Sequence, residues 1–327
     1  VPTEPPAVPS PTLPPFSPVP PLTLPPTTLP PTSVPRTIAP TIFVPYQRPE
    51  ICNQASPCYT TLEQLKGALN VPQDPNSPIY LCNDIALEEE MPLMIQQEGT
   101  TLIGCCDNAK CKIRRTNLAT RVLSVMAKDF TMQNIIVQDG KCPPVERFGD
   151  FDAGGNMNIS MAGGTTKIID CEFWNGECQR DGYEGTAHLY ANGGGTLTIS
   201  GSKFVGGTNS YTGSFFDGID VTVDNCEFLR NEGIAFVGWD GLFEISNSWF
   251  RENQGRDAGA IFVTEISALT KLHVWNTYFD NNIGETSTNV HVVAEVEWNN
   301  NTGIGNSCSD LSCFCSYAND ICRCHEC

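Results

Sequence analysis

Two acidic residues near the middle of the chain come closest to a catalytic pair. Asp217 and Asp220 stand in the string FFDGID. Two carboxyl groups held about 6.5–9.5 Å apart across a sugar can hydrolyse a glycosidic bond with inversion, one as acid and the other as base. The same string also fits a turn, because Asp before Gly218 is a common turn dipeptide. The sequence favours the turn, so we predict no catalytic residue.

A second acidic string offers oxygen ligands for a cation. Asp150 and Asp152 in GDFDAGG could bind Ca²⁺, which prefers carboxylate and carbonyl oxygens. A solvated acidic loop is the competing interpretation and the favoured one. We therefore predict no cofactor and no metal site, with calcium as the one open possibility. Arg114 and Arg115, which could assist such an ion, are expected at a corner after a strand.

Common catalytic motifs are missing from the sequence. It has no Gly-x-Ser-x-Gly, no phosphate-binding P-loop and no His-Glu-x-x-His. The four histidines are His188, His273, His291 and His325, and none stands in a catalytic context. We predict that the protein is not an enzyme.

Charge narrows the range of partners. Among 327 residues, 37 are acidic and 19 are basic, which gives a net charge of −18. No basic surplus exists to neutralise phosphates, so nucleic acid is excluded as a partner. Repulsion likewise opposes binding of a polyuronate. No run of 18 apolar residues is present, so no membrane span is expected.

Sixteen cysteines predict an oxidising compartment, hence a secreted, extracellular or cell-surface protein whose signal peptide is gone. All sixteen are disulfide candidates: Cys52, Cys58, Cys82, Cys105, Cys106, Cys111, Cys142, Cys171, Cys178, Cys226, Cys308, Cys313, Cys315, Cys322, Cys324 and Cys327. The first ten could form five bridges, and the short loops suggest Cys171 with Cys178 and Cys52 with Cys58. The last six predict a disulfide-rich cap over 308–327, with a metal site that includes His325 as the alternative.

Residues 1–50 form a separate region that contains 18 of the 25 prolines. We predict an extended polyproline arm, which could instead be a disordered spacer. Its hydroxyl residues are candidates for O-glycosylation: Thr3, Ser10, Thr12, Ser17, Thr23, Thr27, Thr28, Thr32, Ser33, Thr37 and Thr41. Its apolar residues could dock in a groove of another subunit: Leu13, Phe16, Leu22, Leu24, Leu29, Ile38, Ile42 and Phe43.

Seven eight-residue segments in the body of the chain align on one another: 130–137, 166–173, 197–204, 221–228, 243–250, 272–279 and 291–298. Positions 1 and 3 are mostly apolar, the spacing of a strand with one buried face. Position 8 is Val137 in the first segment, Trp298 in the last and Phe in the five between. Position 5 is mostly Asn, Asp or Gly, which tolerate a left-handed bend and could form an amide ladder when stacked.

The spacing of these segments predicts the fold. Successive position-8 residues lie 19 to 36 positions apart, an irregular period that suits stacked coils whose turns accept insertions. Each strand must still lie about 4.8 Å from the next. The sequence therefore predicts an all-β parallel solenoid over 51–307, with aromatic side chains stacked inside it.

Several strings resemble a known family. FLRN at 228–231, FREN at 250–253, FDNN at 279–282 and AGAI at 258–261 are similar to the FxxN and GGAI motifs of right-handed parallel β-helix proteins, which include adhesin-like and pectin-lyase-like secreted proteins. The stretch 79–113 resembles the first coils of cysteine-bearing β-helix proteins of algal secretomes. The resemblance implies a right-handed β-helix, and it implies little about function because the fold hosts lyases, hydrolases, adhesins and inert rods.

These features favour a structural function. We predict a secreted glycoprotein that self-assembles into an extracellular or cell-surface filament, with the arm docked on a neighbouring subunit. Asn158 and Asn300 lie in N-glycosylation sequons, so covalent glycans are expected. The alternatives are a polysaccharide lyase or hydrolase and an adhesin or glycan-binding protein. Trp174, Tyr183 and Tyr190 could form a sugar-binding groove, or could equally pack as loop residues.

Overall fold

The computed structural model describes residues 46–54, 56–71, 77–116, 120–142, 154–160, 163–178, 185–264, 270–284, 289–293, 295–299, 301–304, 312–316 and 321–325. Residues 1–45 of the predicted arm lie outside these ranges, as do Asp150, Asp152, Tyr183 and Asn300. So do Cys308 and Cys327.

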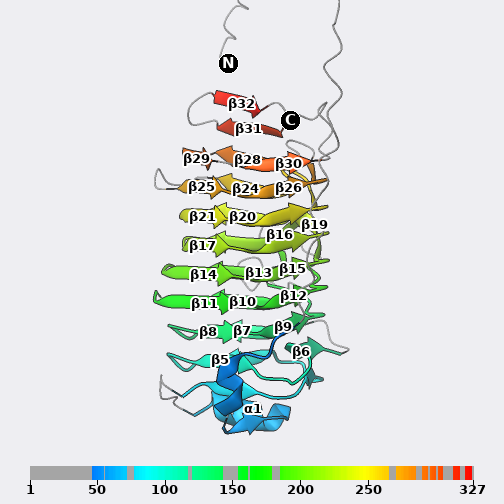
Figure 1. Cartoon of the computed structure of the whole chain (residues 1–327), viewed down its shortest axis with the longest axis vertical. Helices are drawn as coiled ribbons and strands as arrows, with labels where there is room; N and C mark the ends of the chain where they lie inside the picture. Colours follow the sequence, from blue (N-terminus) through cyan, green and yellow to red (C-terminus); the bar gives the residue numbers. More distant parts are fainter. Residues whose placement is uncertain are drawn as a thin grey trace, which may run out of the picture. The chain divides into compact units, whose positions relative to one another are not determined.

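The described chain is a right-handed parallel β-helix, as predicted, built from three sheets whose strands stack coil upon coil (Figure 1). Each coil contributes one strand to sheet A, then one to sheet B, then one or two to sheet C. The described pairings are parallel apart from one antiparallel pair at the C-terminal end. Neighbouring strands in space therefore lie one whole coil apart in sequence.

The strand bounds follow the predicted repeat. Sheet A contains β1 (Cys58–Tyr59), β2 (Ile79–Leu81), β5 (Thr101–Gly104), β8 (Thr131–Gln133), β11 (Thr165–Ile169), β14 (Thr196–Ser200), β17 (Asp220–Asp224), β21 (Leu242–Ser246), β25 (Lys271–Trp275) and β29 (Glu295–Asn299). Sheet B contains β3 (Ile85–Leu87), β6 (Cys111–Arg115), β9 (Ile135–Gln138), β12 (Glu172–Trp174), β15 (Lys203–Val205), β18 (Glu227–Leu229), β22 (Trp249–Arg251), β26 (Tyr278–Asp280) and β30 (Thr302–Ile304).

Sheet C contains β4 (Leu93–Ile95), β7 (Leu123–Val125), β10 (Met157–Ser160), β13 (Thr186–Asn192), β16 (Thr208–Asp217), β20 (Phe236–Trp239), β24 (Ile261–Thr264), β28 (Val290–Val293), β31 (Ser312–Ser316) and β32 (Ile321–His325), with β19 (Glu232–Ile234), β23 (Gln254–Gly255) and β27 (Ile283–Gly284) at its side. β31 and β32 form the antiparallel pair, in which Cys313 lies opposite Cys324 and Cys315 opposite Cys322. Residues 312–316 and 321–325 of the predicted cap thus form a paired hairpin, while its disulfides remain a prediction.

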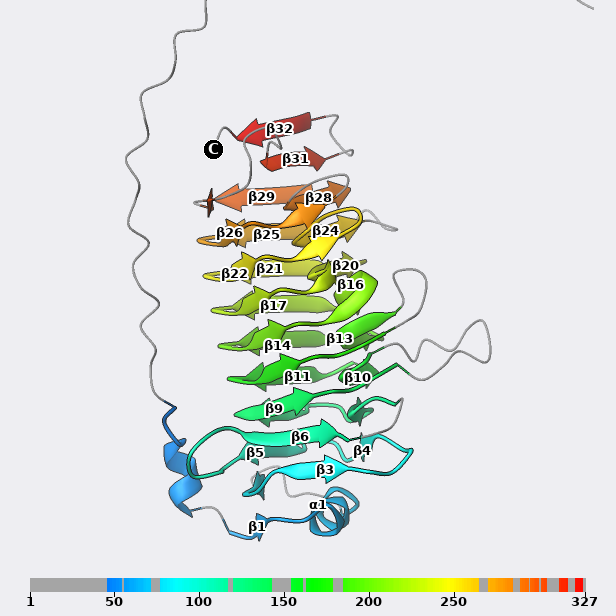
Figure 2. The same ribbon diagram turned by 90° about the vertical axis from the view of Figure 1, so that its right-hand side faces the viewer.

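Two short helices belong to the N-terminal end of the stack. Helix η1 (Glu50–Gln54) is a 3₁₀ turn, and α1 (Leu62–Leu69) packs on β2, β3 and β4 (Figure 2). The side chain of Thr61 caps α1 by accepting the backbone N–H of Gln64. Leu65 and Leu69 of α1 are buried in the core, so the helix closes the first coil against water.

Position 8 of the repeat forms the column of aromatic rings that the sequence predicts. Phe173, Phe204, Phe228, Phe250 and Phe279 stack with centroids 4.6 to 5.5 Å apart and with ring planes within 12° of parallel. All five are buried. The rings follow the strand spacing, so each coil covers the apolar face of the one before it.

Position 5 of the repeat adopts the predicted left-handed bend between sheets A and B. Asn134, Asp170, Gly201, Asn225, Asn247 and Asn276 all have φ between 49° and 59°. A second left-handed column, two residues after position 8, includes Arg230 (φ 53°) and Glu252 (φ 54°). Asp139, Asn175, Gly206 and Asn281 occupy the same column at φ between 48° and 64°, so residue types that tolerate a left-handed bend mark this second corner too, although it was not predicted.

The seventh predicted segment, 291–298, is out of register, and its alignment is wrong. Leu272 of β25 pairs with Val296, and Phe279 of β26 pairs with Gly303. The seventh repeat is therefore 296–303, five residues later. Its position 8 is glycine instead of an aromatic residue, and the apolar alternation from 291 imitates a strand of sheet A while the chain is still in sheet C.

Candidate functional site

The carboxylate pair of FFDGID lies at a turn between two sheets. Asp217 ends β16 in sheet C and Asp220 begins β17 in sheet A, with Gly218 at φ 64° between them. The Oδ1 atom of Asp220 accepts the backbone N–H of Leu242 on the next coil at 2.9 Å. Asp129 makes the same kind of bond to the N–H of Thr165 at 2.9 Å. Asp220 and Asp129 therefore do the same thing: each links a turn to the first strand residues of the next coil.

The paired arginines do not lie at a corner after a strand, contrary to the prediction, because both belong to β6. Arg114 is exposed and Arg115 is 3 % exposed. The Arg115 guanidinium donates to the backbone carbonyls of Arg121, Met91 and Glu89. Burial lowers the pKa of Arg115 to about 10, which leaves it charged at neutral pH. Arg115 therefore binds loop carbonyls and not a ligand.

Four disulfides connect eight of the first ten cysteines, and both short-loop pairings predicted above are wrong. The bonds are Cys52–Cys105, Cys58–Cys82, Cys106–Cys111 and Cys142–Cys178. Three of them join residues 24 to 53 apart. Stacking brings residues one coil apart into contact, as in Cys58–Cys82 and Cys142–Cys178, and of the four bonds only Cys106–Cys111 joins cysteines close in sequence.

The other two cysteines, Cys171 and Cys226, are buried free thiols. Both occupy position 6 of the repeat, where Ser202 lies on the coil between them and Ser248 on the coil after Cys226. Two coils separate the thiols by about 9.6 Å, beyond the roughly 7 Å Cα distance that a disulfide can span. Burial raises the pKa of each thiol to about 12, so both stay protonated. They serve as packing residues.

The amide ladder occurs at the Asn of the FxxN strings, three residues after position 8, and not chiefly at position 5 as predicted. Asn231 donates to Asn253 Oδ1 at 2.9 Å, and Asn253 donates to Asn282 Oδ1 at 3.0 Å. Each of the three also donates to the carbonyl of a Phe one coil earlier. All three are buried, and Asn282 extends the ladder to Asn289 at 3.1 Å. At position 5, Asn276 and Asn247 make one exposed contact at 3.3 Å.

A buried histidine continues this ladder into coils that have glycine at the Asn position. His188 Nε2 lies 2.9 Å from Asn231 Oδ1, and His188 Nδ1 lies 3.1 Å from Asn156 Nδ2. Because the Asn156 amide donates to Nδ1, the neutral ring carries its proton on Nε2. A Cβ at Gly207 would lie 2.6 Å from Nε2, so only glycine leaves room for the ring. Burial lowers the pKa of His188 to about 4.

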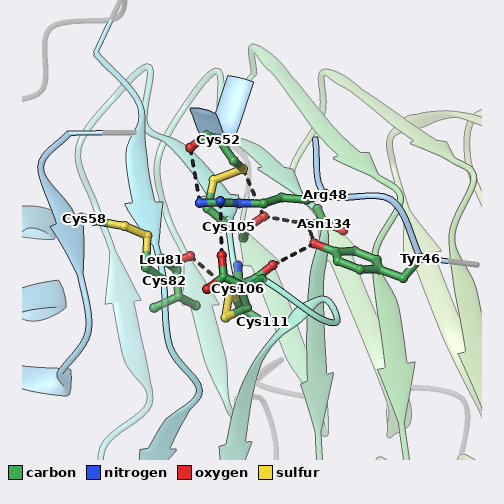
Figure 3. Close-up of a disulfide and its surroundings, with 12 residues drawn as sticks. Tyr46, Arg48, Cys52, Cys58, Leu81, Cys82, Cys105, Cys106, Cys111 and Asn134 are labelled. Atoms are coloured by element: carbon green, nitrogen blue, oxygen red, sulfur yellow. Dashed lines mark hydrogen bonds and ion pairs between the residues drawn. A yellow bond between two sulfur atoms is a disulfide. The ribbon is translucent and has the colours of Figure 1, made fainter. Parts of the chain in front are cut away.

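The segment that precedes η1 is fastened to the body at one site, hereafter the anchor (Figure 3). The Tyr46 hydroxyl donates to the carbonyl of Cys106 at 3.2 Å and accepts from Asn134 Nδ2 at 3.0 Å. Arg48 forms an ion pair with Asp107 at 3.1 Å. The Cys52–Cys105 disulfide follows four residues later. The anchor therefore holds residues 46–52 on the body.

The outer face of sheet B carries a ladder of alternating charge. Lys110 pairs with Glu172 at 3.0 Å, and Lys203 pairs with Glu227 at 3.3 Å. The pKa of Glu172 is lowered: burial acts to raise it, and the attraction and hydrogen bond of Lys110 outweigh that effect. Arg251 then lies 3.7 Å from Glu227 and 3.5 Å from Asp280. The cations and anions on this face thus balance each other.

Aromatic side chains interrupt the charge ladder on the same face. Trp249 is 40 % exposed, and its ring lies 6.1 Å from that of Tyr278 on the next coil and 6.0 Å from the Arg251 guanidinium. Trp174 is half-buried and donates from Nε1 to Glu172 at 2.9 Å. Trp249 and Tyr278 were missed as site residues, although both stand at position 7 of the repeat, which points outward in a strand whose position 8 is buried.

The predicted sugar-binding groove does not form from the residues proposed for it. Tyr190 is buried on the outer side of sheet C, where it stacks on Phe215 at 5.5 Å and packs with Val237 and Phe262. Trp174 lies on a different sheet. The sequon residue Asn158, in β10, is 4 % exposed, which argues against a glycan on the folded chain at that position.

Metal and membrane features are absent from the part of the chain that the structure describes. No group of three or more His, Cys, Asp or Glu residues is arranged there to hold a metal ion. Within the same ranges, no helix has the length and apolar character needed to cross a bilayer. Calcium at Asp150 and Asp152 stays a prediction, because both residues lie outside the described ranges.

The fold and its four disulfides define a cystine-linked parallel β-helix. No family model and no curated protein sequence matches the chain. Among solved structures, the pectin methylesterase of Aspergillus niger is 16% identical, with a TM-score of 0.41 over 80% of this chain and 88% of that one. A pectin methylesterase variant in complex with a hexasaccharide is 15% identical, with a TM-score of 0.34 over 69% and 76%. Likeness at this level carries no information about activity.

Proposed function

We propose that the chain is a secreted structural protein, a filament subunit whose proline-rich arm docks on a neighbouring subunit. The anchor is the observation that carries this proposal. A proline-rich segment that serves only as a spacer needs no fixed attachment point. Here Tyr46, Arg48 and Cys52 each fasten residues 46–52 to the body. Tension on the arm would pass through the Cys52–Cys105 bond into the coils.

The body suits the role of a stiff subunit. Its interior is a continuous column of packed rings and buried amides, so bending it would open contacts on every coil. Disulfides between coils restrict the unfolded chain and resist opening outside the cell. An arm that docks on a different surface of a neighbouring subunit gives a head-to-tail contact, which does not close on itself and so produces a fibre.

An enzymatic function has less support. Asp220 is engaged in a coil-linking hydrogen bond and Arg115 binds loop carbonyls. The direct assay incubates the full chain with pectate, alginate and neutral glycans. We expect no product; turnover that disappears in Asp217→Ala or Asp220→Ala would replace the structural proposal with a polysaccharide-active enzyme.

The assembly test compares three full-length chains by electron microscopy and sedimentation velocity. In the arm-serine variant, the eight apolar arm residues named above are replaced by Ser. In the matched control, the eleven arm Ser and Thr residues are replaced by Ala, which keeps the apolar side chains. We expect filaments from the wild type and the control and monomers from the arm-serine variant. Filaments from all three would refute the proposal.

A further inference from the structure

We propose that the outer face of sheet B around Trp249 and Tyr278 is the surface on which the arm of a neighbouring copy docks. This inference rests on the proposed function and adds the receptor for the arm. The surface, hereafter the platform, consists of Leu229, Trp249, Arg251, Tyr278 and Asp280 on β18, β22 and β26.

The platform presents an exposed aromatic side chain, Trp249, on a strand whose position is fixed by its neighbours. Trp249 is the one aromatic residue among the large exposed hydrophobic side chains of the described ranges. Its ring lies 6.0 Å from the Arg251 guanidinium on the same strand and 6.1 Å from the Tyr278 ring, which is its register partner on the next coil. A rigid, amphipathic aromatic side chain loses little conformational entropy on binding, and such residues dominate binding energy at interfaces.

The balanced charges of this face favour it as a contact surface between two copies of an acidic chain. The chain carries a net charge of −18, so two copies repel each other over most of their surfaces. On the platform, Arg251 is flanked by Glu227 and Asp280, and the next cation along the ladder, Lys203, pairs with Glu227. A partner that approaches here meets balanced charges and an apolar ring.

The arm has the chemistry that this surface would accept. Residues 1–45 contain 17 prolines and only two charged residues, Glu4 and Arg36, of opposite sign. Proline-rich segments bind to surfaces lined with aromatic side chains, because their restricted backbone is already extended. The arm is thus neutral where the rest of the chain is acidic, and it can lie on a neighbour without repulsion.

The length of the arm permits contact with another copy. An extended proline-rich chain of 45 residues spans about 140 Å at roughly 3.1 Å per residue. Nine stacked coils are only about 43 Å high at about 4.8 Å per coil. The arm can therefore pass beyond its own body and still reach the platform of the next subunit.

The test uses full-length chains with paired substitutions. The platform variant is Trp249→Ala with Tyr278→Ala. The matched control is Trp275→Ala, which removes a half-buried Trp from the outer face of sheet A on the same coil as Tyr278. Sedimentation gives the protein concentration at which half of the chain is assembled, and circular dichroism melting verifies that each variant folds. We expect the platform variant to raise this concentration more than about tenfold, and the control to change it less than about twofold.

Each outcome has a defined meaning. Wild-type assembly of the platform variant, with assembly lost in the arm-serine variant, would overturn the docking surface and leave the filament proposal in place. Assembly of the arm-serine variant would overturn both. If the platform variant melts at a lower temperature than the wild type, a second test replaces it. Excess synthetic peptide of residues 1–45 should dissolve wild-type filaments and quench the tryptophan fluorescence of the chain. If the peptide does neither, the platform is refuted. Trp249-dependent retention on a neutral glucan matrix, with no effect of the peptide, would assign the surface to a polysaccharide instead.

Discussion

His188 makes the stability of the body depend on pH in a way that one substitution should remove. Its ring is fully buried between Asn156 and Asn231, and the neutral form satisfies both partners. Protonation would put a second N–H against the Asn156 amide, which already donates, and would bury a charge. The perturbation is a fall in pH from 7 to 4, compared between the wild type and His188→Gln.

The sign and size follow from the pKa. Burial lowers the pKa of His188 from 6.5 to about 4 in the folded chain, and the hydrogen bond to Asn231 opposes the change in part. Between pH 6.5 and 4 the unfolded chain binds the proton and the folded chain does not, so stability rises with pH across this window. A difference of roughly 2.5 pKa units corresponds to about 3 kcal/mol of unfolding free energy, which is present above pH 6.5 and is lost as the pH falls to 4.

Urea denaturation followed by tryptophan fluorescence measures this difference. The wild type should lose about 3 kcal/mol between pH 6.5 and 4. His188→Gln should be less stable at pH 7 and should lose far less on acidification. His273→Gln is the control for the loss of a histidine, because His273 is partly exposed beside Glu244 at 4.0 Å and lies outside the ladder. An equal pH slope in the wild type and His188→Gln would refute this account of the ladder.

Three further predictions concern the core and the cysteines. Phe228→Ala should lower the unfolding free energy by about 3–5 kcal/mol, since it opens a gap between two stacked rings, whereas Trp249→Ala on the outside should cost less than about 1 kcal/mol; a chemical denaturation series measures both, and equal losses would contradict the packing. Cys226→Ser should change the same quantity by less than about 1 kcal/mol, because serine occupies this position on both neighbouring coils; a loss above about 2 kcal/mol in a melting experiment would show that the site needs the thiol. Replacing both Cys52 and Cys105 by Ser should destabilise the chain by about 4 kcal/mol, and replacing both Cys106 and Cys111 by about 2 kcal/mol, because the first bond closes the longer loop; the reverse order would contradict the chain-entropy argument.

The sequence predicted those features that repeat on every coil. Position 8 carries Phe on five successive coils, so its stacked column could be read from spacing alone. Position 5 needs a residue that tolerates positive φ, and the recurrence of Asn, Asp and Gly at this position predicts the bend. The seventh coil has no Phe at position 8. The alternation of apolar residues runs through both β28 and β29, so the predicted segment began in β28, five residues too early.

Features that depend on contacts between coils were harder to predict. Two of the four disulfides, Cys58–Cys82 and Cys142–Cys178, join cysteines on neighbouring coils, so short sequence separation pointed to the wrong partner for Cys58 and Cys178. His188 of β13 continues a ladder of asparagines that lie in the turns between sheets B and C, and no local sequence pattern indicates its contact with Asn231 beside Gly207. Asn158 has the sequon of a surface site, yet it is 4 % exposed in the folded chain.

The most direct test of the account is a cryo-electron microscopy reconstruction of the assembled wild-type chain. We predict a filament in which an extended proline-rich segment of one subunit crosses the side chains of Trp249 and Tyr278 on the next. Monomers at all concentrations, or a filament in which each arm contacts only its own body, would contradict assembly through an exchanged arm.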